Sequence, residues 1–159
     1  TQASSSAASD VYKRQVYWTY FKQHNIIWTI MNKILVEVSV GELLDKISIL
    51  EIKSEKIKDP EKLNFINDEY KILKDQLQAN IKLDTVIENL YNSLKEINLR
   101  LWTIEDDKRL CEKNSNFGER FIKLSRDVHF LNDERAKIKL EINNITGSKI
   151  KEIKEYTSY

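Results

Sequence analysis

Apolar residues recur at alternating spacings of three and four through most of this sequence beyond residue 40. The most regular run is Ile87, Leu90, Leu94, Ile97, Leu101 and Ile104, and a similar run extends from Phe121 to Ile145. Residues three and four apart lie on one face of an α-helix, so each run forms a single apolar stripe. The chain of 159 residues has only three glycines and one proline, which are too few turn-forming residues for a many-stranded sheet. The sequence therefore predicts an all-α fold.

Capping residues divide the chain into four predicted helices. Ser39 and Glu42 form a capping-box pattern that begins the first helix. Asp59 and Pro60 end that helix and begin the second, because proline lacks only a donor that is unpaired in a first turn. Thr85 and Glu88 form another capping box, which begins the third helix.

The fourth predicted helix follows the polar run 114–116 and ends at Gly147, where a left-handed C-terminal cap is expected. Short connections between the four helices predict an antiparallel four-helix bundle that runs up, down, up and down, or helical hairpins with heptad seams. Lys33 to Val38 alternates apolar and charged residues, which predicts a short strand or extended arm. Lys149 to Tyr159 is expected to form a terminal helical turn or a packed extended tail. We expect one helical domain over residues 31–159.

The first thirty residues are expected to be a non-native, disordered leader. Residues 1–15, TQASSSAASDVYKRQ, resemble translated sequencing-adapter DNA and show no apolar period. Met31 is the only methionine, and it is the start that we expect. A secretory signal is disfavoured because residues 22–24 interrupt the apolar run and no cleavage site follows. An amphipathic membrane-surface helix over residues 16–30 fits better but lacks a basic face.

Charge and cysteine content narrow the expected partners and compartment. The formal net charge is +1, and it falls to about −1 when residues 1–30 are left out. Such a balance gives no long-range attraction to nucleic acid or to anionic lipid, so neither is an expected partner. The single cysteine, Cys111, excludes an intrachain disulfide and favours a reducing compartment. No uncharged stretch approaches the roughly 18 residues of a spanning helix, and we expect a cytoplasmic protein.

Arg135 departs most clearly from the apolar pattern, because it occupies a stripe position of the fourth helix. A buried guanidinium is costly without an anionic partner, so something anionic should meet it. If the last two helices pair about a turn near Ser115, Glu96 is one carboxylate within reach. Arg135 then either sets the register or reaches a surface salt bridge, or it forms part of a ligand or catalytic anion site.

A second, largely polar stripe lies beside the apolar stripe of the first helix, formed by Asp45, Ser48 and then Glu51 or Ile52. Folding the chain over its connections brings this stripe and Tyr70 to roughly the level of Arg135. These side chains could line a small polar pocket, although a solvated helix face explains the same residues. The candidate ligand-binding residues are therefore Arg135, Glu51, Ser48, Asp45, Tyr70 and Glu96.

Other reactive residue types give weaker indications. The acidic run 105–107 cannot gather on one face, because consecutive helical residues point about 100° apart, so we expect no metal site. We expect these acids to pair instead with Lys123 and Arg126 across the last turn. His129 lacks a nucleophile placed by any motif, and Cys111 is expected to be a small buried residue. With no glycine-rich phosphate loop and no zinc spacing, we expect no cofactor.

Four blocks of the sequence resemble an uncharacterised bacterial and phage family, domain of unknown function 6165. They are VSVGELLDKISILEIKSEKI at 38–57, LWTIEDDKR at 101–109, FIKLSRDVHFLNDERAKIKLEIN at 121–143 and GSKIKEIKEY at 147–156. The resemblance implies no activity, substrate or partner, because the family has none established. It supports Met31 as the start, since the first block begins shortly after it.

Two classes of function fit these observations. The first is a non-enzymatic helical protein-interaction module, with a protein partner or self-association, because regular heptads form protein-binding surfaces. The alternative is a small all-α enzyme or ligand-binding protein with an anion site centred on Arg135.

Overall fold

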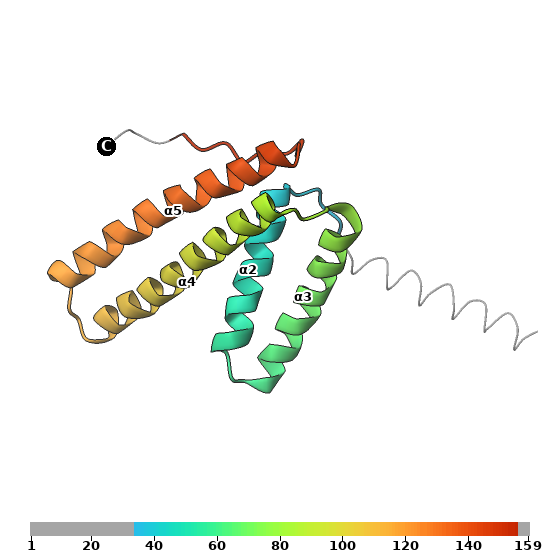
Figure 1. The fold of residues 1–159 in the computed structure, drawn as a ribbon. Coiled ribbons are helices and arrows are strands. Elements are labelled where there is room, and N and C mark those ends of the chain that lie inside the picture. Colours follow the sequence, from blue (N-terminus) through green and yellow to red (C-terminus); the bar gives the residue numbers. More distant parts are fainter. Residues whose placement is uncertain (1–33, 156–159) are drawn as a thin grey trace, which may run out of the picture. The chain divides into compact units, whose positions relative to one another are not determined.

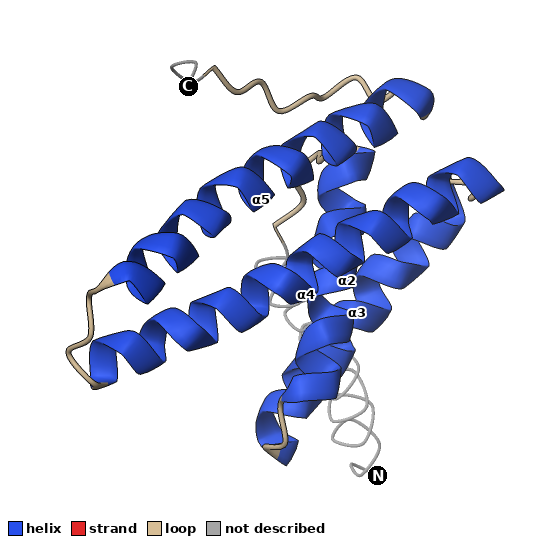
Figure 2. Ribbon diagram, turned by 60° about the vertical axis from the view of Figure 1, so that its left-hand side comes forward, coloured by secondary structure: helices blue, strands red, loops and turns tan. Residues whose placement is uncertain are grey.

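The computed structural model describes residues 34–155, and this part of the chain consists of helices and loops only (Figure 2). The helices are α2 (Val40–Lys56), α3 (Pro60–Asn80), α4 (Thr85–Lys113) and α5 (Glu119–Ile145). The predicted all-α fold is confirmed. Residues 34–38, predicted as a strand or extended arm, form no strand. Residues 1–30, predicted to be a leader, lie outside the described residues.

The helix ends follow the predicted caps with one exception. The Ser39 hydroxyl accepts a hydrogen bond from the Glu42 backbone N–H at 3.2 Å, and the Asp59 side chain caps α3 ahead of Pro60. Helix α4 is capped by Asp84, not by Thr85: the Asp84 carboxylate accepts from the Ile87 N–H at 2.9 Å. An aspartate one residue earlier caps the helix through the Ile87 N–H, and Thr85 becomes the first helical residue. Gly147 adopts the expected left-handed conformation, with φ of 64°.

The four helices form two hairpins, α2 with α3 and α4 with α5, and the hairpins are inclined to each other (Figure 1). Helix α2 packs against all three other helices. Among the described helices, α2 is the only one whose backbone lies close alongside α3. A simple bundle that runs up, down, up and down would also place α3 along α4. Helix α2 is instead the element that joins the two hairpins.

The hydrophobic core has two parts, which lie at different levels along α4. The first part gathers buried side chains from all four helices, namely Leu44, Ile47, Leu77, Ile87, Leu94 and Ile142. The second part, Ile97, Leu101 and Leu131, lies between α4 and α5. The stripe positions of the sequence therefore supply most of the core. No helix in the described part of the chain is both long and apolar enough to cross a membrane.

The segment after α5 carries no helix over its described residues and extends back beside α5 (Figure 2). It contacts the helices through Glu152, whose carboxylate lies 3.0 Å from the Lys139 ammonium group. Of the two predictions for this segment, the extended tail is the one that the structure shows for residues 149–155, although all of these residues are exposed. Residues 156–159 lie outside the described part.

Candidate functional site

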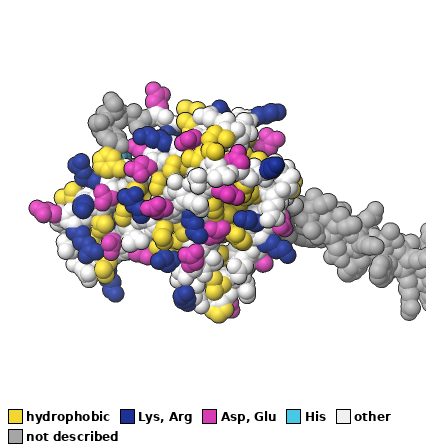
Figure 3. All heavy atoms as spheres, viewed as in Figure 1, with side chains coloured by type: hydrophobic (Ala, Val, Ile, Leu, Met, Phe, Trp, Pro, Cys, Tyr) yellow, Lys and Arg dark blue, Asp and Glu magenta, His cyan; other side chains and the backbone are white. Residues whose placement is uncertain are grey.

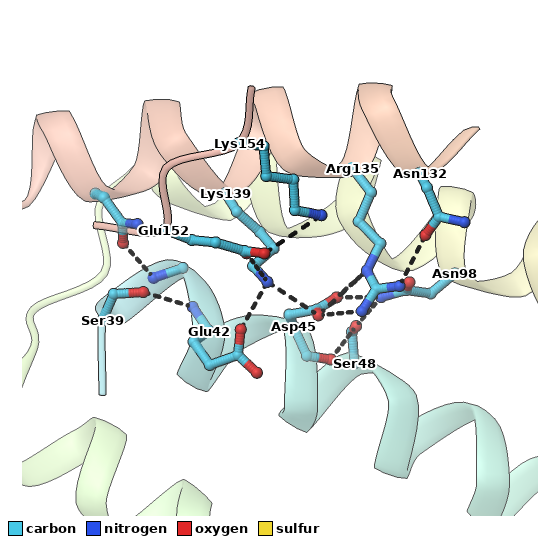
Figure 4. Close-up of polar contacts among 12 residues, drawn as sticks. Ser39, Glu42, Asp45, Ser48, Asn98, Asn132, Arg135, Lys139, Glu152 and Lys154 are labelled. Carbon is cyan, nitrogen blue, oxygen red and sulfur yellow. Dashed lines mark hydrogen bonds and ion pairs between the residues drawn. The ribbon is translucent and has the colours of Figure 1, made fainter. Parts of the chain in front are cut away.

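A buried polar cluster, the Asp45 cluster, lies where the N-terminal half of α2 meets α4 and α5 (Figure 4). Its centre is Asp45, whose side chain is only 2% exposed. Ser48, one turn later on the same face of α2, is fully buried and donates to the Asp45 carbonyl at 2.8 Å. Carboxylates are rarely buried unless they are paired, so the surrounding side chains explain how Asp45 is tolerated.

Arg135 of α5 binds the Asp45 carboxylate with two nitrogens on one edge of its guanidinium group. Its Nε lies 3.0 and 3.2 Å from the two carboxylate oxygens, and its Nη2 lies 2.7 Å from Oδ2. The amide oxygen of Asn132 accepts from Nη1 at 3.3 Å. Bidentate, charge-assisted pairs of this kind are among the strongest hydrogen bonds in proteins. Burial alone would lower the pKa of Arg135, but the Asp45 carboxylate outweighs this effect and the pKa is raised.

Asn98 of α4 joins this pair to the third helix. Its amide nitrogen donates to the Asp45 carboxylate and to the Ser48 hydroxyl, both at 2.8 Å. Both amide hydrogens of Asn98 are thereby used inside the cluster. The three helices α2, α4 and α5 therefore share one hydrogen-bonded network.

Lys139, one turn after Arg135, extends the network toward the C-terminal segment. Its side chain is 8% exposed, and its ammonium group lies 2.6 Å from Glu42, 3.0 Å from Glu152 and 3.7 Å from Asp45. Burial would lower the pKa of Lys139, but the hydrogen bonds to Glu42 and Glu152 raise it overall. The same contact lowers the pKa of Glu152. The Glu42 carboxylate therefore binds Lys139. The predicted capping box would have it accept from the Ser39 backbone N–H instead.

A close backbone approach of α2 and α5 lies beside Lys139. The Gly41 N–H donates to the Asn143 side chain at 2.7 Å. A Cβ atom at position 41 would lie 2.5 Å from the Lys139 carbonyl oxygen, closer than real Cβ atoms come to backbone. Gly41 therefore allows α2 to approach α5 closely enough for the polar contacts to form.

A second polar cluster, the Glu51 cluster, lies two turns further along α2. The Tyr70 hydroxyl of α3 donates to Glu51 at 3.2 Å, and the Lys95 ammonium group of α4 lies 2.9 Å from the same carboxylate. Burial would raise the pKa of Glu51, but Lys95 and the nearby tyrosines Tyr91 and Tyr70 lower it overall. Burial and the adjacent Glu51 carboxylate raise the pKa of Tyr91. The two clusters hold α2 to its three neighbours.

A surface hollow of about 330 Å³ opens beside the Asp45–Arg135 pair, along α4. Its polar and aromatic lining consists of Asn98, Trp102, Glu105, Asp106, Arg109 and Arg135. Glu105 also pairs with Lys108 at 3.5 Å. The hollow is thus lined by charges of both signs, together with one indole ring.

Comparison with known proteins identifies the chain at the level of a family. A family model described as "Family of unknown function (DUF6165)" matches residues 34–159. This chain belongs to that family. No curated protein and no solved structure matches it. The DUF6165 assignment confirms the resemblance of the four sequence blocks, and it carries no activity or partner with it.

The structure divides the predicted site residues of this DUF6165 chain among three places. Arg135, Asp45 and Ser48 meet in the Asp45 cluster, whereas Glu51 and Tyr70 meet in the Glu51 cluster. Glu96 lies on the exposed surface of α4, and the carboxylate that binds Arg135 is Asp45. The chain itself therefore supplies the negative charge that Arg135 needs. Whether any of these residues binds a ligand stays a prediction.

Asn98 and Lys139 are the central members of the Asp45 cluster that the sequence analysis missed. Both positions fit a helical stripe, because Asn98 lies four residues after Leu94 and Lys139 lies four residues after Arg135. Adjacent apolar residues, Ile97 and Ile138, fit the stripes equally well and hid this signal. A polar residue four positions after a stripe residue was the sequence signal that could have identified Asn98 and Lys139.

The remaining reactive residues have simpler environments. Asp107 pairs with Arg120 at 3.0 Å, so the predicted approach of residues 105–107 to Lys123 and Arg126 is displaced by about one turn. Cys111 is buried and free, as expected, and His129 lies on an exposed face. Residues 34–155 contain no group of three or more His, Cys, Asp or Glu side chains able to hold a metal ion.

Proposed function

We propose that this protein is a non-enzymatic helical interaction module that binds a second copy of itself through the outer face of α3. One observation carries this proposal. Helix α3 lies close alongside α2 alone among the described helices, yet it bears a second set of apolar side chains. Phe65 is 76% exposed and Ile72 is 60% exposed. Exposed apolar patches on a helix are typical of protein-binding surfaces.

Phe65 and Ile72 lie seven residues apart, so they share one face of α3 at a distance of about two turns. Each immediately precedes a residue that faces the core, Ile66 and Leu73, and therefore lies about 100° around the helix from it. Burying a large apolar side chain contributes about 1.5–3 kcal/mol. Association costs on the order of 4–15 kcal/mol in lost freedom, so we expect a weak, concentration-dependent dimer.

The charges beside this face favour a second copy as the partner. Lys62 and Glu69 also lie seven residues apart, on one flank of the Phe65–Ile72 face. In an antiparallel pair of α3 helices centred next to Phe65, each Lys62 lies opposite Glu69 of the other copy, the two Phe65 side chains meet, and each Ile72 lies opposite the N-terminal end of the other α3. Within one chain these residues make only long, exposed pairs, Lys62 with Asp59 at 3.5 Å and Glu69 with Lys46 at 3.7 Å. Such pairs contribute little and exchange readily.

The first experiment measures the mass of the protein by light scattering over a range of concentrations. We expect the apparent mass to rise with concentration in the parent, and to stay at the monomer value in the double variant Phe65→Ser, Ile72→Ser. Ile122→Ser is the matched control, because Ile122 is 56% exposed on α5. A parent that stays monomeric at every concentration contradicts the proposal, and so does equal loss of association in the control.

Charge reversal tests the arrangement of the two copies. Lys62→Glu should weaken association, because it places two acidic groups opposite each other twice in a symmetric dimer. Adding Glu69→Lys to the same chain should restore it. Failure of the second substitution to restore association would contradict the antiparallel pairing.

The proposal places the module in the cytoplasm, without nucleic acid or membrane as a partner. The support is the free, buried Cys111 and the mixture of charges on the surface. Acidic and basic side chains are interspersed on the face shown in Figure 3. The alternative, an enzyme or binding protein with an anion site centred on Arg135, has less support because Asp45 already neutralises that guanidinium group.

A further inference from the structure

The hollow beside Arg135 presents hydrogen-bonding groups that the rest of the protein holds in place. Arg135 uses three of its five N–H bonds on Asp45 and Asn132, which leaves two without an acceptor among the described residues. Asn98 uses both amide hydrogens inside the Asp45 cluster, so its oxygen is the group left to accept. Both side chains line the hollow. Because buried partners fix their orientation, little freedom is lost when a ligand binds.

The charges around the hollow do not select an anion. Arg109 and Arg135 are balanced by Glu105 and Asp106 in the same lining, and Asp45 lies directly behind Arg135. A phosphate or carboxylate would therefore meet repulsion from two acidic side chains as well as attraction from two arginines. A neutral ligand avoids that repulsion and still finds N–H donors and carboxylate acceptors side by side.

Trp102 supplies the aromatic part of the lining of the hollow, and Ile49 and Leu101 supply its aliphatic part. An indole face packs against flat apolar surface, including the C–H face of a pyranose ring. Sugar hydroxyl groups donate and accept at the same time, so they match a wall that carries both kinds of partner. The volume of about 330 Å³ lies at the small end of the range of roughly 300–1,000 Å³ for ligand pockets, which suits a single ring.

We propose that this hollow binds one neutral sugar ring, stacked on Trp102 and hydrogen-bonded by Arg135, Asn98, Arg109 and Glu105. This site is separate from the association surface on α3, since none of its lining residues belongs to α3. A small ligand in an open hollow makes few contacts, and we expect dissociation constants on the order of millimolar.

The test uses saturation-transfer NMR on the full chain with the methyl glycosides of glucose, galactose and mannose, and with N-acetylglucosamine. We expect transfer to the ring protons of at least one of them. Arg109→Ala should weaken binding about fivefold or more in an NMR titration, because Arg109 lines the hollow. The fold should be unaffected, since Arg109 is exposed and lies outside the Asp45 cluster. Arg100→Ala, an exposed arginine of α4 that does not line the hollow, is the matched control and should bind as the parent does.

Trp102→Ala should abolish the transfer, and its melting temperature and NMR spectrum show whether the half-buried position still folds. Absence of transfer to all four sugars overturns the proposal. It is also overturned if inorganic phosphate binds more tightly than every sugar and Arg109→Ala removes that binding, since the hollow is then an anion site. Equal weakening by Arg100→Ala and Arg109→Ala overturns it as well.

Discussion

Replacing Arg135 by leucine should destabilise the protein even though leucine restores the apolar stripe of α5. The substitution leaves Asp45 with its side chain 2% exposed and without its bidentate partner. Removing one member of a buried ion pair typically costs about 3–5 kcal/mol, because the other charge stays buried. Lys139, at 3.7 Å from Asp45, and the burial of the new leucine offset part of this cost. We expect a net loss of about 3 kcal/mol.

Urea unfolding followed by circular dichroism measures this loss at neutral pH. In a domain of this size, about 3 kcal/mol corresponds to a fall in melting temperature on the order of 10 °C. The matched control is Arg120→Leu, which removes an arginine of α5 that pairs with Asp107 on the surface. An exposed pair contributes about 0–1 kcal/mol, so this variant should unfold close to the parent.

The double variant Asp45→Leu, Arg135→Leu separates the cost of the orphaned charge from the value of the pair. Removing both charges should recover most of the stability that Arg135→Leu loses, because no carboxylate then remains buried. Asp45→Leu alone should cost less than Arg135→Leu, since the Arg135 side chain is 27% exposed and its charge can reach water. An Arg135→Leu variant as stable as the parent, or a double variant less stable than both single variants, would refute this reasoning.

Two further predictions concern the helix contacts around the clusters. Gly41→Ala should lower the free energy of unfolding by about 1–3 kcal/mol in thermal unfolding, because its Cβ would lie 2.5 Å from the Lys139 carbonyl oxygen. Gly118→Ala is the control and should change little, since its Cβ would lie 3.5 Å from the nearest atom. Equal effects of the two substitutions would contradict the steric explanation. The lowered pKa of Glu51 predicts stabilisation that is complete above its ordinary value of 4.5 and is lost as the pH falls through the lowered value. Glu51→Gln should therefore reduce the dependence of the unfolding free energy on pH in the acid range, and an unchanged dependence in urea titrations would contradict this assignment.

The local structure was predictable because its causes are local. Stripe spacing, Ser39, Asp59 with Pro60, and Gly147 each act within a few residues of the helix end that they define. The misplaced cap at Thr85 shows the limit of such patterns. Asp84 and Thr85 are adjacent residues that can both cap a helix, and only the backbone conformation decides between them.

The inclination of the two hairpins was not predictable, because apolar stripes do not state which helix they face. The stripe of α2 contributes to contacts with α3, α4 and α5 at once, a role that its spacing does not distinguish from that of an ordinary bundle helix. The hydrophobic effect is non-directional, so a stripe fixes burial but not the partner. The same limit applies to Arg135. Its stripe position predicts that a carboxylate binds it, but does not decide between Glu96 and Asp45.

The Asp45 cluster fixes the register of α5 along α2, which the apolar stripes do not specify. If α5 slipped by one heptad along α2, the apolar stripes would still match, but Val128 or Ile142 would replace Arg135 opposite Asp45. That slip would bury a carboxylate without a counter-charge, at a cost of several kcal/mol, and Gly41 would meet a different part of α5. The polar cluster therefore penalises the shifted arrangements more than it stabilises the native one. On this reasoning the double variant Asp45→Leu, Arg135→Leu should keep most of its stability while it loses its unique register. Additional amide peaks in its NMR spectrum would reveal that loss, whereas a single set of sharp peaks would show that the register is fixed elsewhere.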